Sequence, residues 1–169
     1  MDYKALQKNR FTAGDYSIAP IREEDMEPIR QWRNAQVEVL RQKGELTPEA
    51  QARYYREVVR PLFDLDEPEQ LLFSYFLAGA LIGYGGLVHL SWPDRRAEMS
   101  FLVSPERALE PALYEEAMRH FITLMKQVCF EELAFNRLRT ETYGFRHQTL
   151  AILEAGGFVR EGVMRDHVI

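Results

Sequence analysis

The middle of the chain carries a long uncharged stretch that predicts two adjacent β-strands. No Asp, Glu, Lys or Arg occurs from Gln70 to Pro93, a length that would in principle cross a bilayer. Four glycines interrupt the stretch and aromatic residues are frequent in it, which is typical of strands and not of a membrane helix. We therefore expect strands over residues 71–77 and 81–90, joined by a turn at residues 78–80.

After this stretch the hydrophobic pattern continues as a strand and then changes to that of a helix. Residues 92–95 read as a turn and residues 97–103 as a third strand, which predicts an antiparallel meander. A short turn follows, and apolar side chains then recur at helical spacing over residues 112–130. A strand that leads into a helix N-terminus is a common position for anionic cofactors in α/β proteins.

Local start and stop signals place the remaining elements. Acidic residues in the segment 22–26 begin a helix that ends at residues 32–34. Thr47 followed by Pro48 begins a second helix, which runs to about Leu62. The other expected elements are two short strands around a turn at residues 13–15, a strand over 136–143, a helix over 148–155 and a last strand over 158–169.

Composition restricts the class of protein. The 169 residues suit a single domain, and 46% apolar and 28% charged residues are ordinary for a globular protein. A net charge of −5 argues against broad nucleic-acid binding, which needs a basic face. Cys129 is the only cysteine and the N-terminus lacks the apolar region of a signal peptide. We therefore expect a cytoplasmic protein without disulfides and without a membrane partner.

The histidines do not form a metal-binding pattern. His120, His147 and His167 lack ligand spacing with a cysteine or with a cluster of carboxylates. Structural and catalytic zinc sites need such clusters. We therefore predict no metal site.

Five short strings occur in a fixed order along the chain. They are Ile29-Arg-Gln-Trp-Arg-Asn34, Ile82-Gly-Tyr-Gly-Gly-Leu87, Arg96-Ala-Glu-Met99, Asn136-Arg137-Leu138, and Leu153-Glu-Ala-Gly-Gly-Phe158 followed by Glu161-Gly-Val-Met-Arg165. Together they resemble the GNAT (GCN5-related) N-acetyltransferase superfamily, in particular the branch with the ribosomal-protein alanine and nucleotide-linked amino-sugar N-acetyltransferases. The likeness covers residues 11–169, so we expect residues 1–10 to be a flexible arm and the family's final strand to be missing after residue 169.

The resemblance implies both a fold and an activity. The fold is α/β (α+β): a mixed, mostly antiparallel twisted sheet that is splayed at its middle strands, with helices on both faces. The activity is acetyl-CoA-dependent N-acetyl transfer to a primary amine on a small molecule, an amino sugar or a protein N-terminus. The amine attacks the thioester directly, and a base removes its proton, often through water. The sheet edge that a missing last strand would expose favours association into a homodimer, and the net charge predicts no nucleic-acid partner.

The resemblance also assigns residues to the binding of acetyl-CoA and of the amine. The pantetheine arm would pair with the backbone of Phe101, Leu102 and Val103 in the splay. Further cofactor-binding positions by resemblance are Arg107, Ala112, Leu113, Arg146 and Thr149. The acceptor pocket would be shaped by Trp32, Arg33, Asn34 and Tyr84, with a role in the core as the alternative for Trp32.

The expected pyrophosphate loop departs from the family pattern Gln/Arg-x-x-Gly-x-Gly/Ala. No glycine occurs from Leu87 to Tyr143, and Glu110 or, in the shifted register, Pro111 replaces the key glycine. Glycine lets a backbone approach phosphate, glutamate adds negative charge and proline removes an N–H donor. The family's frequent thiolate-protonating tyrosine has no counterpart either. Two hypotheses therefore stay open: an acetyltransferase, or a GNAT-fold binding or assembly module without CoA-dependent activity.

Two titratable side chains on neighbouring strands are candidate catalytic bases. Glu98 begins the strand that enters the splay, where the family often has glutamate. Partial burial of such a carboxylate favours proton uptake near neutral pH. His89 on the preceding strand is the second candidate. The alternatives are a surface ion pair of Glu98 with Arg95 or Arg96, and a purely structural histidine.

Overall fold

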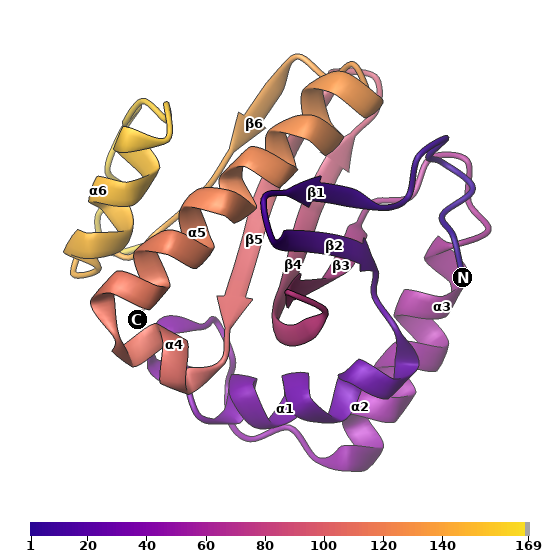
Figure 1. The fold of residues 1–169 in the computed structure, drawn as a ribbon, viewed down its shortest axis with the longest axis horizontal. Coiled ribbons are helices and arrows are strands. Elements are labelled where there is room, and N and C mark those ends of the chain that lie inside the picture. The colour runs from indigo at the N-terminus through magenta and orange to yellow at the C-terminus, as the bar shows by residue number, and fades with distance from the viewer. Residues whose placement is uncertain (168–169) are drawn as a thin grey trace.

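The computed structural model describes residues 1–167 as a six-stranded sheet with helices on both of its faces (Figure 1). The strands lie in the sheet in their order along the chain. Neighbours from β1 to β5 are antiparallel, and β5 and β6 are parallel. The strands are β1 (Phe11–Ala13), β2 (Tyr16–Pro20), β3 (Leu71–Leu77), β4 (Ala80–Ser91), β5 (Arg96–Val103) and β6 (Arg137–Arg139).

Helices fill the two long connections of the sheet. Thr47 caps α2 as predicted, because its hydroxyl oxygen accepts a hydrogen bond from the Ala50 N–H at 3.1 Å. The π-helical turn Tyr55–Val59 joins α2 to α3, so the helix predicted to reach Leu62 is continuous. The helices are α1 (Met26–Asn34), α2 (Pro48–Tyr54), α3 (Arg60–Leu62), α4 (Pro105–Leu109), α5 (Pro111–Lys126) and α6 (His147–Ala155).

Two adjacent residues of β3 show why helices cover both faces of the sheet. Side chains alternate between faces along a strand. The Tyr75 hydroxyl donates to the Ala117 carbonyl in α5 at 2.6 Å. The neighbouring Ser74 hydroxyl donates to the Asp25 carboxylate at 2.6 Å, directly before α1. Therefore α5 and α1 lie on opposite faces of the sheet; in Figure 1, α5 crosses in front of β5 and α1 lies below the strands.

Close packing of α5 on the sheet depends on the glycines of β4. A Cβ atom added at Gly85 would lie 2.8 Å from Cζ of Phe121 in α5 and 2.2 Å from the carbonyl oxygen of Ser100 in β5. Both distances are shorter than van der Waals contact, so this position requires glycine. The uncharged stretch is therefore the pair of strands that its pattern predicts, and no helix within residues 1–167 has both the length and the apolar character to cross a membrane.

The first ten residues differ from the prediction of a flexible arm. Tyr3 is 1% exposed, and its ring stacks on that of Phe63 with centroids 4.3 Å apart. The Tyr3 hydroxyl donates to the Leu72 carbonyl at 2.8 Å and accepts from the Leu72 N–H at 2.9 Å. The sequence of this segment gives little indication of a buried anchor, because Tyr3 and Leu6 are its only large apolar side chains besides Met1.

The C-terminal part also differs from its prediction. The strand expected over residues 136–143 is restricted to β6, and the last strand expected from residue 158 is not formed in residues 158–167. Residues 168 and 169 of that strand lie outside the described part of the chain. Without a further strand, β6 has β5 as its one neighbour in the described sheet.

Candidate active site

The strands β5 and β6 separate after a short stretch of pairing. Arg96, Ala97 and Glu98 pair with residues 137–139, and the chain then turns away from β5 toward α6 (Figure 1). The second half of β5 therefore has a strand neighbour only on the β4 side. This is the splay of the middle strands that the resemblance implies.

The backbone of Phe101 faces the gap between the separated strands. The Met99 carbonyl accepts from the Thr140 hydroxyl at 3.5 Å, and the Val103 carbonyl accepts from Nε2 of Gln36 at 2.9 Å. Backbone groups alternate in direction along a strand, so the N–H and C=O of Phe101 point to the same side as these two carbonyls. Leu102, the middle residue of the predicted pantetheine site, directs its backbone groups toward β4. An unpaired strand edge of this kind can bind an extended ligand.

A groove of about 1210 Å³ occupies the splay. One wall is β5 from Glu98 to Val103, and the opposite wall is the segment of residues 137–146. On one side the groove reaches α5 and α6, and on the other it reaches residues 36–41 after α1. Two ligands could therefore meet at β5 from opposite sides of the sheet.

Polar side chains connect α6 to the first turn of α5 at one side of the groove. Arg146 donates from Nη2 to the Tyr114 hydroxyl at 3.1 Å, and that hydroxyl lies 2.9 Å from the Thr149 hydroxyl. Gln148 donates to the Pro111 carbonyl at 2.8 Å. Arg146 and Thr149, which the resemblance assigns to cofactor binding, line the groove, and so does Tyr114, which is not among the residues predicted from the sequence. In the sequence Tyr114 is only one more apolar position of α5, because the residues that its hydroxyl contacts lie more than 30 residues away along the chain.

The segment expected to bind pyrophosphate contains the N-termini of two consecutive helices, α4 and α5. After α4, Glu110 forms the N-cap of α5 without a capping hydrogen bond from its side chain. Glu110 is exposed, so its carboxylate does not lie buried beside the groove. The N–H groups of Ala112 and Leu113 belong to the first turn and have no acceptor within the helix.

The other predicted cofactor residue on this segment has a different environment. Arg107 lies close enough to Tyr16 and Tyr75 to influence the pKa of each hydroxyl, although burial is the main cause that raises both pKa values. Arg107, Ala112 and Leu113 are not among the side chains that line the groove. Of the two arginines predicted to bind the cofactor, Arg146 lines the groove and Arg107 lies outside its lining.

The structure brings the two candidate bases together at the other side of the groove. The Glu98 side chain is 13% exposed and forms an ion pair with Arg139 at 3.2 Å. Nε2 of His89 lies 3.8 Å from the Glu98 carboxylate, at a β-bulge where His89 has a φ of 49°. The predicted alternative partners, Arg95 and Arg96, do not form this ion pair.

The ion pair of Glu98 is part of a longer chain of charges. Arg139 also contacts Glu141 at 2.9 Å, and Glu141 forms a second ion pair with Arg41. The hydrogen bond from Arg41 holds the pKa of the Glu141 carboxyl below its usual range, and Arg139 adds to this effect. The charge network thus connects the loop after α1 to β5 and β6 across the groove.

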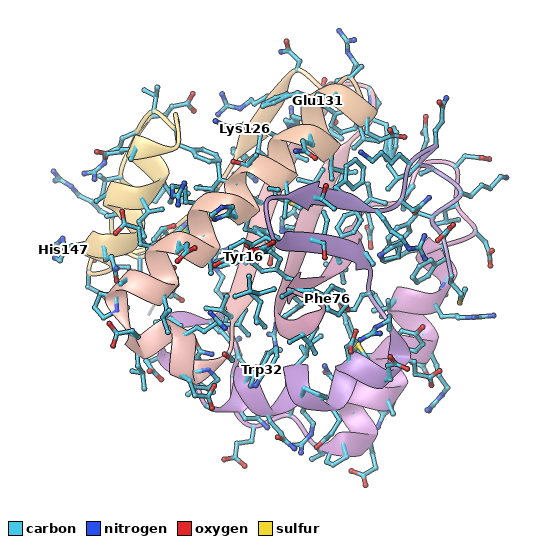
Figure 2. All side chains as sticks on the ribbon, viewed as in Figure 1. Tyr16, Trp32, Phe76, Lys126, Glu131 and His147 are labelled. Carbon is cyan, nitrogen blue, oxygen red and sulfur yellow. The ribbon has the colours of Figure 1, made fainter. Side chains whose placement is uncertain are left out.

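The predicted acceptor residues lie beside the groove and do not line it. Arg33 donates from Nη1 to the Tyr84 hydroxyl at 2.5 Å. The Asn34 side chain donates to the Leu46 carbonyl at 2.9 Å and accepts from the Leu46 N–H at 2.8 Å, so it fixes the following loop. Trp32 packs against the core on the side of α1 toward the sheet (Figure 2). None of these four side chains is part of the groove lining.

The described residues contain no cluster that resembles a metal site. No group of three or more His, Cys, Asp or Glu side chains lies together within residues 1–167.

Comparison with known proteins relates this geometry to a family. The family model of the acetyltransferase (GNAT) domain matches residues 18–169. No curated protein sequence is significantly similar to the chain.

Solved structures of spermidine N-acetyltransferase from Vibrio cholerae have the same fold. A complex with CoA and spermine is 14% identical, with a TM-score of 0.72, and the alignment covers 89% of this chain and 84% of that chain. A dodecameric form in an intermediate state is 18% identical, with a TM-score of 0.70 and coverage of 89% and 82%. Mutant forms of the spermidine/spermine N-acetyltransferase SpeG are 16% identical, with a TM-score of 0.76 and coverage of 93% and 87%. At these identities the likeness concerns the fold.

Proposed function

Since the chain belongs to the GNAT acetyltransferase family, we propose that it transfers the acetyl group of acetyl-CoA to a primary amine of a small molecule. The observation that carries this proposal is the unpaired edge of β5 beside the groove. The groove opens toward α5 and α6 on one side and toward Glu98 and His89 on the other. It therefore offers separate approaches for a donor and for an acceptor. Spermidine is the substrate named for the structural relatives and serves as a reference acceptor for this chain.

The residues of the cofactor side fit the two chemical parts of acetyl-CoA. The free N–H and C=O of Phe101 suit the amides of the pantetheine arm. The first-turn N–H groups of α5 and the Arg146 guanidinium suit the phosphates, because both are donors to anions. When bound, acetyl-CoA supplies the thioester that the amine attacks.

The residues of the acceptor side fit the removal of a proton. An amine must lose a proton to form an amide, and the Glu98 carboxylate is a partly buried proton acceptor that lines the groove. Proton uptake by Glu98 would weaken its ion pair with Arg139, so release of the proton restores the pair. His89 is 70% exposed and lies beside Glu98, which suits passage of the proton to solvent.

A non-catalytic binding or assembly module is the second candidate function. The observation in its favour is the absence of glycine from the segment between β5 and α5, where Pro111 removes an N–H donor. The exposure of Glu110 weakens this argument, because its carboxylate can remain in solvent. The two candidates differ in whether acetyl-CoA binds.

Thermal unfolding with increasing acetyl-CoA tests the proposal. Ligand at a hundredfold excess over Kd stabilises the folded state by about 2.7 kcal/mol. For a chain of this size that corresponds to a rise in Tm of roughly 5–10 °C. A Tm that stays constant up to millimolar acetyl-CoA would contradict the acetyltransferase. If the Tm of the wild type stays constant, the variant Glu110→Gly shows whether the loop is the cause. A Tm shift with acetyl-CoA in this variant alone would mean that the loop prevents binding in the wild type.

A further inference from the structure

The acceptor side of the groove has a defined charge pattern. The charged lining residues around Glu98 are Arg41, His89, Arg139 and Glu141, and the groove is also lined by Glu154, Glu161 and Asp166. Arg139 contacts Glu98 at 3.2 Å and Glu141 at 2.9 Å, and Arg41 forms an ion pair with Glu141. Each carboxylate in this part of the groove is therefore already bound to a guanidinium.

This pairing disfavours a polycationic acceptor. A linear polyamine carries several ammonium groups, and each one that enters the groove needs a carboxylate to replace its hydration. The two carboxylates here are neutralised by Arg41 and Arg139, and these arginines would repel a second ammonium group. The cluster around Glu98 therefore leaves room for one amine and contains no further carboxylate for a second ammonium group.

Arg41 has N–H donors that its contact with Glu141 does not use. A guanidinium carries five N–H donors, and Arg41 uses Nη2 in its contact with Glu141. Arg139 uses both of its terminal nitrogens, on Glu141 and on Glu98. The Arg41 side chain is 55% exposed, and exposed ion pairs contribute little stability. A ligand anion can therefore join or replace Glu141 on Arg41 in the planar geometry that guanidinium favours.

We propose that the acceptor is an amine that also carries an anionic group, a carboxylate or a phosphate, and that Arg41 binds this group while the amine lies near Glu98. The inference rests on the proposed acetyltransferase function. It makes Arg41 a specificity-determining residue, because the contact selects the acceptor without taking part in proton transfer.

Matched acceptor pairs test the inference. The acetylation rate is measured for 4-aminobutyrate against 1-aminobutane, for glucosamine 6-phosphate against glucosamine, and for spermidine. We expect kcat/KM for at least one anionic member to exceed that of its neutral partner by about tenfold or more, the scale of one charge-assisted contact. The pair that shows the preference tells whether a carboxylate or a phosphate is recognised.

The variant Arg41→Gln should reduce the preference for the anionic acceptor to about one-tenth of its value, mainly through KM. Arg10→Gln is the matched control, because Arg10 is another exposed arginine, paired with Asp2 and outside the groove. Its preference should equal that of the wild type.

Three results would overturn the inference: a higher kcat/KM for spermidine or for the neutral amines, an unchanged preference in Arg41→Gln, or acetyl-CoA binding without acetylation of any of the five amines. Failure of acetyl-CoA to bind would instead refute the proposed function.

Discussion

The environment of Glu98 depends on residues that lie far from it in the chain. Its ion-pair partner is Arg139 on β6, and His89 lies on the other side of its carboxylate. The neighbours in sequence, Arg95 and Arg96, do not form this pair. The parallel register of β5 and β6 places Glu98 directly opposite Arg139. The candidate base is therefore positioned by strand pairing.

The variant Glu98→Gln should lower kcat/KM by about a hundredfold or more, because the amide cannot accept the proton of the amine. Rates of acetylation measured over a range of pH provide the test. Glu24→Gln removes an exposed carboxylate that is paired with Arg22 on the surface, and should act as the wild type. If Glu98→Gln keeps the wild-type kcat/KM at every pH, Glu98 is not the base.

Cys129 should be inert in the folded protein. Its side chain is 0% exposed, and burial raises the pKa of its thiol to about 12. Because the thiolate is the reactive form, we expect an aromatic disulfide reagent at pH 8 to react only through opening of the structure. The rate should rise by orders of magnitude in denaturant. Reaction of the native protein at the rate of a free thiol would contradict this burial.

The same thiol makes stability depend on alkaline pH. Above the ordinary thiol pKa of about 9.0 the unfolded chain loses the proton, whereas the folded chain keeps it up to about 12. The unfolded state then binds fewer protons, so the free energy of unfolding falls between these values. Cys129→Ala should reduce this part of the pH dependence, measured by denaturant unfolding at pH 8 and pH 10.

At the level of elements, β5 performs two tasks along its length. Its first half pairs with β6 and holds Glu98 beside Arg139. Its second half is paired on the β4 side alone and presents the backbone of Phe101 to the groove. The splay thus arises where β6 ends after three residues.

The contact of α5 with β4 gives a prediction about glycine. Gly85→Ala should destabilise the protein by about 2 kcal/mol or more, because the added Cβ would overlap with Ser100 and Phe121. Gly144→Ala is the matched control, since a Cβ there meets nothing within 4 Å. Its effect on the free energy of unfolding should stay within about 0.5 kcal/mol. Equal effects of the two variants, measured by denaturant unfolding, would contradict the close packing.

For the whole molecule, the N-terminal segment joins the helices to the sheet. Tyr3 stacks on Phe63, next to α3, and its hydroxyl binds both backbone groups of Leu72 in β3. The segment packs into the same hydrophobic core as the strands. Its loss should therefore weaken the entire domain and not only its edge.

Tyr3→Ala should reduce the free energy of unfolding by about 3–5 kcal/mol, the usual cost of removing a buried aromatic ring. The exposed Tyr54 provides a control, and Tyr54→Ala should cost about 1 kcal/mol or less. Chemical denaturation measures both. If both variants change the free energy of unfolding by equally small amounts, the N-terminal segment is the flexible arm that the sequence predicts.

The sequence by itself determined the elements whose signals are local. Thr47 and Pro48 marked the start of α2, and the uncharged stretch marked β3 and β4, because caps and periodic patterns act over a few residues. The order of the short strings was sufficient to predict the family that the comparison confirms. Phe101 and Glu98, which the resemblance singled out as cofactor-binding residue and candidate base, both line the groove.

Only the tertiary structure decided which distant side chains meet. The ion pairs of Arg41 with Glu141 and of Glu98 with Arg139, and the contact of Tyr114 with Thr149, join separate parts of the chain. Such contacts leave no local pattern, because they depend on strand register and on helix packing. For the same reason Asn34 was assigned to the acceptor, although it holds Leu46, and the strand expected after residue 158 was not formed up to residue 167. A strand needs a partner as well as a suitable sequence, and only the fold supplies the partner.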